Sequence, residues 1–377
     1  MRIGLTCTTI EPSITNGHID GIGTYTKNLY DAFNTKKEQV FPYSFANQKG
    51  LKSSFSNGNF FPFSYSFSTV SSFLTPAKFN LNGRFKNKID LLHVTDHMLP
   101  KISDVPIIAT ICDGLMFNNN NWHWNKIKLA NIKKWLRKKT IHWADHFITI
   151  SNAMVPELVN YIGIKEENIS VVHLGIQKDW FIKKSEENKN LVLKKFNLPN
   201  NFLLFTGTLQ QKKNLPRIIN AYLELPTDIQ DNYPLVIVGR NGWGSEESLA
   251  SIKKLTDRKK GVWLKYINIE ELKVLFQCAS LYVHPSLHEG FGLTLLEAFA
   301  SETPTLTSNV TALPEVANGA AYLVDPYSVD AIKNGIQNIL TSTNLQKDLV
   351  QKGIIRAQEF SWKKCAEETL KIYKRVL

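Results

Sequence analysis

Residues 281–300 read LYVHPSLHEGFGLTLLEAFA, and this stretch decides the fold class. It opens with the short apolar run Leu281–His284, which is too continuous for a strand with one face in water and is typical of a strand buried on both faces. A turn with two glycines follows, and a helical pattern begins near Leu293. Strand, turn and helix in this order form the building unit of an α/β protein with a parallel sheet.

The turn and the helix after it carry two carboxylates, Glu289 and Glu297, and two glycines, Gly290 and Gly292. The free N–H groups and partial positive charge of a helix N-terminus suit a diphosphate, and glycine lets the backbone approach such a ligand closely. Carboxylates repel phosphate, but they accept hydrogen bonds from hydroxyl groups, each contributing about 1.5–3 kcal/mol. The pattern therefore predicts a phosphate held by the backbone, with a diol bound at each carboxylate.

The same alternation of apolar runs and helical patterns extends along most of the chain. Helices are predicted at Tyr25–Phe33, Ile127–Lys139, Pro216–Glu224, Glu270–Gln277 and Ala331–Leu340. Strands are predicted at residues 2–8, 91–95, 107–112, 147–150, 171–174, 202–206, 235–238, 262–264, 281–284, 305–307 and 321–324. These strands are too many for one doubly wound sheet, so the sequence predicts two α/β domains. The boundary is expected in the polar stretch between Gly175 and Pro199, which gives domains at residues 1–178 and 179–360.

Composition places the chain among ordinary globular proteins. Apolar residues make up 43% and charged residues 21%, which argues against a disordered or fibrous chain. The four cysteines are widely spaced without a CxxC pair, so neither a disulfide framework nor a zinc ribbon is expected. The N-terminus lacks the apolar core of a signal peptide, and no apolar run reaches the ~18 residues of a membrane span. We therefore expect a cytoplasmic protein.

The chain is basic, with 45 Lys and Arg against 33 Asp and Glu, a net charge of +12. The excess is spread over both halves and either favours an anionic partner or serves solubility alone. Nucleic acid is not expected as a partner, because the basic residues are dispersed and no nucleic-acid motif is present. Residues 125–142 are basic and aromatic without an acidic residue, which suggests docking on an anionic membrane surface. A core-packed helix with a solvated basic face is the alternative.

One segment, Phe41 to Phe85, breaks the alternation of strands and helices. It contains ten of the 21 phenylalanines, many serines and no acidic residue, and its periodicity is poor. We interpret it as an irregular excursion whose aromatic side chains pack on the first domain. The alternative is a loop that receives an apolar or lipid-bearing substrate.

The glutamate pair within EGFGLxxLEA resembles the retaining glycosyltransferases of family 4, which have the GT-B fold. The resemblance implies two Rossmann-like doubly wound domains facing across a cleft, an N-terminal one for the acceptor and a C-terminal one for a nucleotide-sugar. The last helix, residues 361–377, would complete the first domain. By the same resemblance, Glu289 contacts hydroxyls of the donor sugar and Glu297 contacts the nucleotide ribose. The diphosphate would be bound along Gly290, Phe291, Gly292, Leu293 and Thr294.

Residues 205–214, FTGTLQQKKN, match a second motif of that family, which places Gly207 and Thr208 beside the donor. The family often has an Arg-Lys pair here that neutralises the diphosphate as it departs. This chain has Lys212 and Lys213, and lysine at the first position lacks the bidentate fork of arginine. The resemblance therefore implies charge stabilisation by two ammonium groups. A solvated basic turn is the alternative.

In the first half, Gly21 and Gly23 precede a helical pattern and resemble the glycine loop that lies against donor phosphate and acceptor in this family. A simple helix-starting turn is the alternative. The strand at residues 107–112 ends in Cys112-Asp113, where the family commonly has His-Asp. A buried cysteine is usually an inert small apolar residue, so we assign Cys112 no catalytic role. Asp113 matches the usual aspartate and is a candidate substrate contact.

No D-x-D motif and no cluster with metal-ligand spacing occurs in the sequence, and lysines with backbone dipoles can stabilise a leaving group instead. We therefore expect a retaining hexosyltransferase that needs neither metal nor cofactor. The expected donor is a nucleotide-sugar, with a mild preference for GDP-mannose from the family resemblance. The expected acceptor is a lipid-linked or cell-surface glycan such as lipopolysaccharide O-antigen, met at the inner face of the cytoplasmic membrane. A nucleotide-sugar epimerase and a non-catalytic binder of anionic polymer or membrane are the alternatives.

Overall fold

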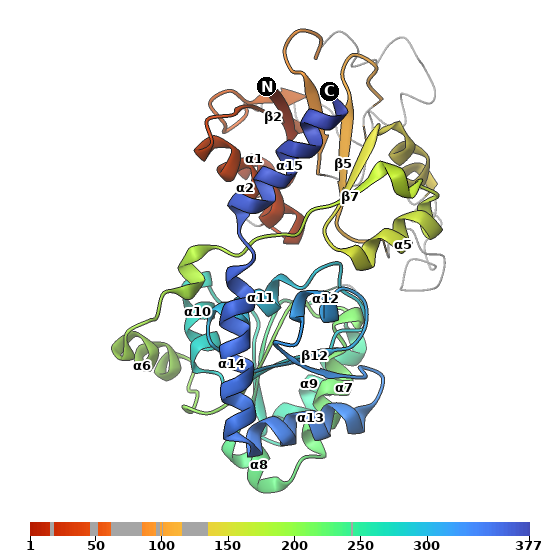
Figure 1. Ribbon diagram of the computed structural model, residues 1–377. Coiled ribbons are helices and arrows are strands. Elements are labelled where there is room, and N and C mark those ends of the chain that lie inside the picture. The colour runs from red at the N-terminus through yellow and green to blue at the C-terminus, as the bar shows by residue number, and fades with distance from the viewer. Residues whose placement is uncertain are drawn as a thin grey trace. The chain divides into compact units, whose positions relative to one another are not determined.

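The computed structural model describes residues 1–15, 19–45, 52–61, 85–95, 99, 101–114, 135–242 and 244–377. The chain divides into two compact units, each built on its own sheet (Figure 1). The first unit comprises Met1–Gly175 and Trp362–Leu377, and the second comprises Ile176–Ser361. Two α/β units with parallel sheets were expected from the sequence, and this fold class is confirmed.

The first unit contains a seven-stranded sheet in the order β3-β2-β1-β4-β5-β6-β7, in which every pair is parallel. Its order reverses between β1 and β4, and such a switch point leaves a crevice at the carboxyl ends of the strands. The strands are β1 (Arg2–Thr6), β2 (Gln39–Phe45), β3 (Asn59–Phe61), β4 (Leu91–Val94), β5 (Ile107–Ile111), β6 (His146–Thr149) and β7 (Ile169–Val171).

The second unit contains a six-stranded parallel sheet in the order β10-β9-β8-β11-β12-β13. Here the order reverses between β8 and β11, so the residues that follow these two strands face the same crevice. The strands are β8 (Leu203–Thr206), β9 (Leu235–Val238), β10 (Gly261–Leu264), β11 (Leu281–His284), β12 (Thr305–Ser308) and β13 (Tyr322–Val324).

Helices connect the strands and cover the sheets within each unit. In the first unit they are α1 (Pro12–Thr15), α2 (Gly21–Thr35), α5 (Val155–Glu157) and α15 (Trp362–Val376). In the second unit they are α6 (Glu186–Lys195), α7 (Leu215–Leu223), α8 (Thr227–Asn232), α9 (Glu246–Asp257), α10 (Ile269–Cys278), α11 (Leu293–Ala300), α12 (Leu313–Ala317), α13 (Val329–Thr341) and α14 (Thr343–Gln358). Single-turn helices of other types occur between them, mostly in the first unit.

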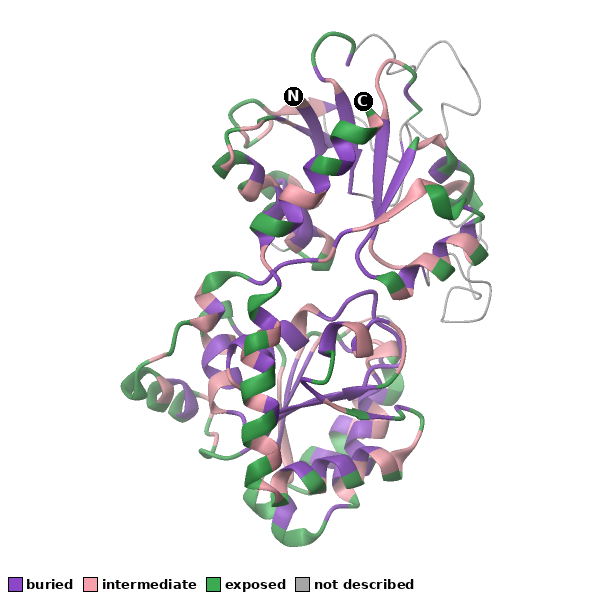
Figure 2. Cartoon of the chain, in the orientation of Figure 1, coloured by how far each residue is buried: buried purple, intermediate pink, exposed green. Residues whose placement is uncertain are grey.

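Both sheets form the cores of their units, as the purple strands in Figure 2 show. The run LVIV of β9 is buried at every position, as expected for a parallel strand covered on both faces. Local signals fix the helices around it. Asn268 and Glu271 form a reciprocal capping box at the start of α10, which satisfies two N–H groups that have no partner inside the helix.

The last helix, α15, belongs to the first unit and packs against α2 (Figure 1). A buried hydrogen bond of 2.5 Å joins the Tyr373 hydroxyl to His93 Nδ1, and His93 Nε2 lies 2.7 Å from the Thr110 hydroxyl. These bonds attach α15 to β4 and β5. A buried polar group without a hydrogen-bond partner costs free energy. The network therefore favours the one packing arrangement in which every one of its groups is paired.

The interpretation of residues 41–85 was correct in that Phe45, Phe61 and Phe85 pack in the core of the first unit, but it was wrong in that two parts of the segment are regular strands. Residues 39–45 form β2, and residues 59–61 form β3 at the edge of the sheet. Pro42 concealed β2, because proline cannot donate to a ladder and is usually read as the end of a strand. In the structure Pro42 pairs in register with Leu5. Most of the remaining segment, including residues 62–84, lies outside the described residues.

Two smaller differences concern element positions. The strand predicted at residues 171–174 is β7, Ile169–Val171, with an extended connection after it. Of the helix predicted at Ile127–Lys139, only its last residues are described, and residues 135–140 are helical.

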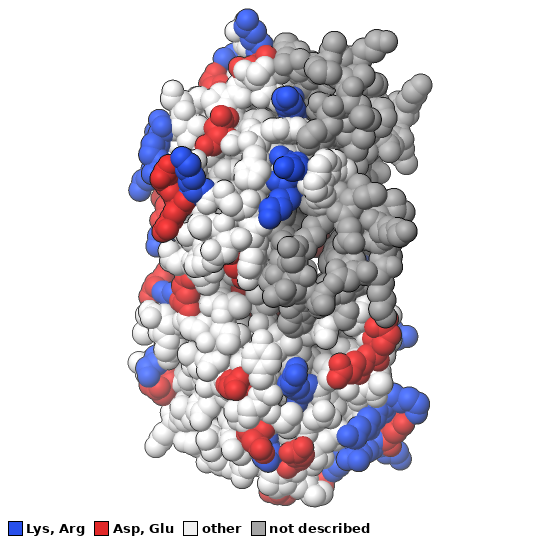
Figure 3. Space-filling view, turned by 90° about the vertical axis from the view of Figure 1, so that its right-hand side faces the viewer, with Lys and Arg blue, Asp and Glu red and all other residues white. Residues whose placement is uncertain are grey.

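No helix in the described part of the chain is both long and apolar enough to cross a membrane. Figure 3 shows Lys and Arg on this face scattered among Asp and Glu rather than gathered in one patch.

Candidate active site

The strongest candidate site lies in the second unit, at the switch point of its sheet. The loop after β8 carries Gly207 and Lys213, and the turn after β11 carries Glu289. A backbone hydrogen bond of 2.8 Å from the amide of Leu287 to the carbonyl of Lys212 ties these two segments together. Residues far apart in the sequence therefore meet where α/β sheets bind ligands.

Lys213 and Glu289 form an ion pair in this site. The Nζ of Lys213 lies 2.6 Å from Oε1 of Glu289, and both side chains are largely shielded from water. Burial opposes the charge of Glu289, but the charge of Lys213, the hydrogen bond from His284 and the charge of Lys212 hold the pKa of this carboxyl well below its usual range. Glu289 is therefore an ionised hydrogen-bond acceptor at neutral pH.

Glu297 lies on α11, one helical turn beyond Leu293. Burial raises the pKa of this carboxyl to about 7, although the charges of Lys213 and Lys273 act in the opposite direction. Lys213 thus acts electrostatically on both carboxylates. The two glutamates differ in kind, because one is ionised in a tight ion pair and the other changes its charge near neutral pH.

Glycines shape the backbone between the two carboxylates. Gly292 caps the N-terminus of α11 with φ 106°, a conformation that side chains rarely adopt. Gly207 has φ 144°, and a Cβ atom there would lie 3.5 Å from Cε of Lys213. Phe291 is buried with its ring edge against Phe360, which anchors the turn. The backbone at the start of α11 is therefore preorganised, with Gly290, Leu293 and Thr294 beside it.

Thr294 and Thr208 differ in their surroundings. The hydroxyl of Thr294 hydrogen-bonds to Tyr282 in the interior, so its side chain supports the site from within. Thr208 is exposed after β8. Lys212 is partly buried beside Lys213. The structure therefore groups all the donor-side residues predicted from the sequence in one region of the second unit.

Three supporting residues of this site were not predicted. Asn214 adopts a left-handed backbone with φ 62°, and its amide donates to the carbonyl oxygens of Pro285 at 2.9 Å and Pro326 at 2.7 Å. Tyr282 and His284 are buried polar residues two positions apart in β11. Their spacing places them on one face of a strand, and polar residues there are a sequence signal for a buried network.

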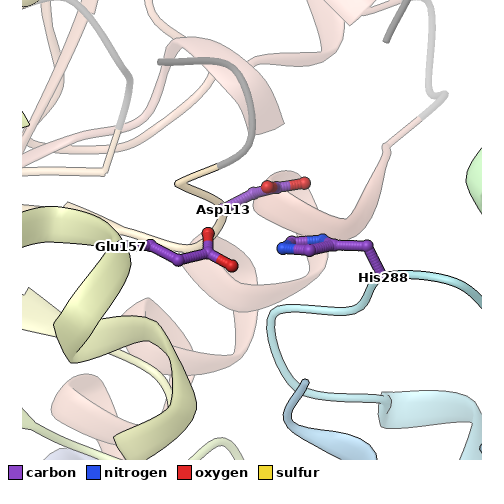
Figure 4. Close-up of side chains that lie close together, drawn as sticks. All are labelled: Asp113, Glu157 and His288. Atoms are coloured by element: carbon purple, nitrogen blue, oxygen red, sulfur yellow. The ribbon is translucent and has the colours of Figure 1, made fainter. Parts of the chain in front are cut away.

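The first unit holds a second group of polar residues at the end of β5. Asp113 and Glu157, drawn in Figure 4, have carboxylate oxygens within 4.8 Å of each other. Glu157 was not predicted, and it lies so close to Gly114 that a Cβ atom there would meet its Oε2 at 2.5 Å. His288, also drawn in Figure 4, belongs to the second unit. Asp113 thus has a carboxylate neighbour within its own unit.

Cys112 precedes Asp113. Burial and the charges of Asp113 and Asp20 raise the pKa of its thiol to about 12, so the thiolate needed for nucleophilic attack is not formed at neutral pH.

Gly21 and Gly23 lie in the first turn of α2, not in a loop before it, because Asp20 caps the helix by accepting a 2.8 Å bond from the amide of Gly23. This corrects the position predicted for the glycine loop.

The basic segment at residues 125–142 lies mostly outside the described residues. Within its described end, Trp135, Lys138 and Lys139 are exposed on the helical residues 135–140.

Comparison with known proteins identifies the family. The model of the Glycosyltransferase Family 4 matches residues 19–180, and the model of the Glycosyl transferases group 1 matches residues 187–356. O-antigen chain mannosyltransferase B of Escherichia coli is 30% identical over 71% of this chain and 70% of that protein. The chain belongs to the group 1 glycosyltransferases. The motifs around Lys213 and Glu289 lie within the matched region of this family.

Two further proteins resemble the chain over different lengths. Serotype-specific mannosyltransferase WbdA of Escherichia coli is 28% identical over 62% of this chain, and the match spans only 29% of WbdA. HepE of Anabaena, crystallised with UDP and glucose, superimposes with a TM-score of 0.73 at 16% identity over the full length of both chains. The fold of the chain is accordingly GT-B.

Proposed function

We propose that this group 1 glycosyltransferase transfers mannose from GDP-mannose, with retention of configuration, to a lipid-linked or cell-surface glycan such as lipopolysaccharide O-antigen. The observation that carries the proposal is the convergence of Lys213, Glu289 and Glu297 beside the glycine turn of α11. An ammonium group, two carboxylates and a helix N-terminus match the diphosphate and the hydroxyl groups of a nucleotide-sugar. The names of mannosyltransferase B and WbdA support mannose as the sugar.

Each residue has a distinct role in this mechanism. Backbone amides at the start of α11 hold the diphosphate, and Glu297 accepts hydrogen bonds from the ribose. Glu289 orients the sugar through its hydroxyl groups. Lys213 stabilises the charge that develops on the departing diphosphate, and its ammonium has three donors, so it can bind phosphate without leaving Glu289.

Retention follows from a displacement on one face of the sugar. The bond between the anomeric carbon and the diphosphate oxygen breaks while the acceptor oxygen bonds to the same face. The departing diphosphate takes the proton of the acceptor hydroxyl. Asp113, in the acceptor-binding unit of this proposal, contacts the acceptor. Lys213 and the helix amides supply the positive charge, and the proposed reaction therefore needs no metal.

We propose that the protein acts in the cytoplasm, at the inner face of the membrane, where it would meet a lipid-linked acceptor. The exposed Trp135, Lys138 and Lys139 support docking of residues 125–142 on anionic lipid, because an aromatic ring and ammonium groups suit the interface of such a membrane. A variant with Trp135→Ala, Lys138→Gln and Lys139→Gln should bind phosphatidylglycerol vesicles less than the unmodified chain. Equal flotation of the two proteins would remove this part of the proposal.

A transfer assay tests the proposal. The full chain is incubated in EDTA with GDP-mannose, UDP-glucose or UDP-galactose and a lipid-linked glycan, and the anomeric configuration of the product is determined by NMR. We expect α-mannosyl product from GDP-mannose and none from Glu289→Gln. Product that requires added Mg²⁺ would overturn the metal-free mechanism. Conversion of the sugar without acceptor would indicate an epimerase instead.

A further inference from the structure

A continuous line of hydrogen bonds leads from the interior of the second unit to Glu289. The hydroxyls of Thr206 and Tyr282 lie 3.0 Å apart, the Tyr282 hydroxyl lies 3.1 Å from His284 Nδ1, and His284 Nε2 lies 3.0 Å from Glu289 Oε1. Tyr282 and His284 are completely buried. In the proposed function only Glu289 has a role, so the three residues behind it need an explanation.

The chemistry of these groups fixes the direction of every bond. Glu289 is ionised beside Lys213, and an ionised carboxylate only accepts, so His284 Nε2 must carry the hydrogen. Burial lowers the pKa of His284, which leaves the imidazole neutral, and its Nδ1 is then an acceptor. The Tyr282 hydroxyl therefore donates to Nδ1, and its oxygen accepts from the hydroxyls of Thr206 and Thr294.

The surroundings hold the imidazole in one orientation. The Tyr282 ring stacks on it at 5.5 Å with an interplanar angle of 14°, and the Phe205 ring lies at 6.3 Å and 30°. The Ser286 hydroxyl lies 3.2 Å from Nε2, and the His284 carbonyl accepts a 2.9 Å bond from the Thr307 hydroxyl. The contacts of the ring come from Phe205 of β8, Tyr282 of β11 and Ser286 in the turn after it, so the ring cannot turn without breaking them. The bond from Thr307 of β12 holds the backbone of His284.

Both donors to the carboxylate bind the same oxygen. Lys213 Nζ and His284 Nε2 both contact Oε1 of Glu289, at 2.6 Å and 3.0 Å. Within the described part of the chain, no side chain donates a hydrogen bond to Oε2 of Glu289. The carboxylate is thus held through one oxygen, and its other oxygen keeps its lone pairs for a ligand.

We propose that His284 is a positioning residue for Glu289, which donates from Nε2 to Oε1 and so reserves Oε2 for a hydroxyl of the donor sugar. Tyr282 and Thr206 set the tautomer that makes this donation available. The inference rests on the proposed function, because the sugar is the ligand that Oε2 serves. It assigns a role to three buried residues, Thr206, Tyr282 and His284, that have none in the proposed mechanism.

The first test is spectroscopic and needs no substrate. The histidines are labelled with ¹⁵N, and the signals of His284 are assigned by their loss in His284→Gln. We expect a neutral ring with its hydrogen on Nε2 from about pH 8 down to about pH 5, where an ordinary histidine is charged. We also expect the Nε2 signal to shift in Glu289→Gln. An Nδ1–H tautomer, or a charged ring at neutral pH, would overturn the proposal.

The second test separates positioning from packing. His284→Leu removes the hydrogen bonds to Glu289, Tyr282 and Ser286. His284→Gln keeps an N–H donor toward Glu289, and Tyr282→Phe removes the donor to Nδ1. We expect His284→Leu to lower kcat/KM for GDP-mannose about 100-fold, as misplacement of a reacting group does, while GDP binding stays within about twofold. His284→Gln should have a kcat/KM about tenfold higher than His284→Leu. The kcat/KM of Tyr282→Phe should lie between those of His284→Leu and the unmodified chain.

The pH profile adds a readout that packing would not change. Without the His284 donor, Glu289 is easier to protonate, so the acidic limb of kcat/KM should move to higher pH in His284→Leu and return in His284→Gln. A parallel loss of GDP binding, or no recovery with glutamine, would reduce His284 to a packing residue. If the unmodified chain transfers no sugar from any nucleotide-sugar, the proposed function fails, and the NMR experiment still decides the tautomer of His284.

Discussion

Nζ of Lys213 lies 2.6 Å from Oε1 of Glu289, although the two residues are 76 positions apart in the sequence. The pair joins the loop after β8 to the turn after β11 across the switch point of the sheet. Each charge stabilises the other in a region shielded from water. Removing one partner therefore leaves the other as an uncompensated buried charge, which is strongly destabilising. Substitutions in this pair therefore test the proposed chemistry, and volume-conserving changes are the most informative.

Replacing Glu289 by Gln should abolish most of the turnover. The amide keeps the shape but loses the charge that strengthens hydrogen bonds to the sugar hydroxyls, so kcat should fall about 100- to 1000-fold. GDP should still bind, because the proposed mechanism assigns Glu289 to the sugar and not to the nucleotide. Steady-state kinetics measures the expected fall in kcat, and calorimetric titration measures the expected retention of GDP binding. Glu302→Gln, which breaks the ion pair to Lys183 in the same unit, is the matched control and should retain activity.

Replacing Lys213 by Met should have a different signature. In the proposed mechanism the leaving diphosphate loses the ammonium group that stabilises it, and Glu289 loses its ion-pair partner, so kcat should fall about 100-fold or more. Lys212→Met should cost less, because it leaves the ion pair between Lys213 and Glu289 intact. The comparison is made by steady-state kinetics at saturating donor. Equal losses in the two variants would contradict the assignment of Lys213 as the residue that stabilises the departing charge.

The sequence predicted the parts of the fold that depend on local patterns. Continuous apolar runs such as Leu235–Val238 and Leu281–His284 are strands wherever both faces of a sheet are covered, and both were placed correctly. The strand β2 was missed because Pro42 interrupts a Phe- and Ser-rich segment, and only its pairing with β1 makes it a strand. Strand pairing is a property of the tertiary structure and leaves no local signal.

In the candidate site too, the sequence predicted the local motif but not the contacts between distant segments. Glu289, Gly292 and Glu297 lie within nine residues and form a readable motif. The motif does not reveal that Glu289 is tied to Lys213 and His284 through a single oxygen, or that Asn214 is bonded to Pro326, 112 positions away. Residue types predict which chemistry is available, whereas the hydrogen-bond partners depend on how distant segments pack.

Nucleotide binding should depend on the charge of Glu297. Burial raises the pKa of this carboxyl to about 7, so it is largely protonated below neutral pH and ionised above it. The ionised form accepts the stronger hydrogen bonds from the ribose, so affinity for GDP should rise between about pH 6 and about pH 8, with proton release on binding near pH 6.5. Calorimetry in buffers of different ionisation enthalpy measures this release.

The control for this effect is Glu297→Gln, which should bind GDP more weakly and without a pH dependence in that range. The same group has a consequence for the unliganded protein. The folded state keeps a proton that the unfolded state loses near its ordinary pKa of about 4.5, so the contribution of Glu297 to stability falls as pH rises from about 4.5 to about 7. An affinity for GDP that is flat from pH 6 to pH 8 would argue against ribose binding by Glu297.

The attachment of α15 to the first unit should weaken in acid. His93 is completely buried between Tyr373 and Thr110, and burial lowers its pKa to about 3. The unfolded state takes up a proton near pH 6.5 and the folded state does not, so the contribution of His93 to stability is complete above about pH 6.5 and is lost as pH falls toward about 3. Hydrogen exchange of peptides from residues 362–376 measures this attachment directly within the full chain.

Tyr373→Phe is the sharpest variant for this contact, because it deletes one hydroxyl and leaves Nδ1 of His93 without its buried partner. The loss should be about 1–3 kcal/mol and should appear as about 5- to 150-fold faster exchange in α15 at neutral pH. Tyr327→Phe, on an exposed side chain of the second unit, is the control and should not change α15. If α15 exchanges equally in Tyr373→Phe and in the unmodified chain, the buried His93 network is dispensable for the docking of this helix, and its other contacts, such as the Lys36–Glu367 ion pair, are sufficient.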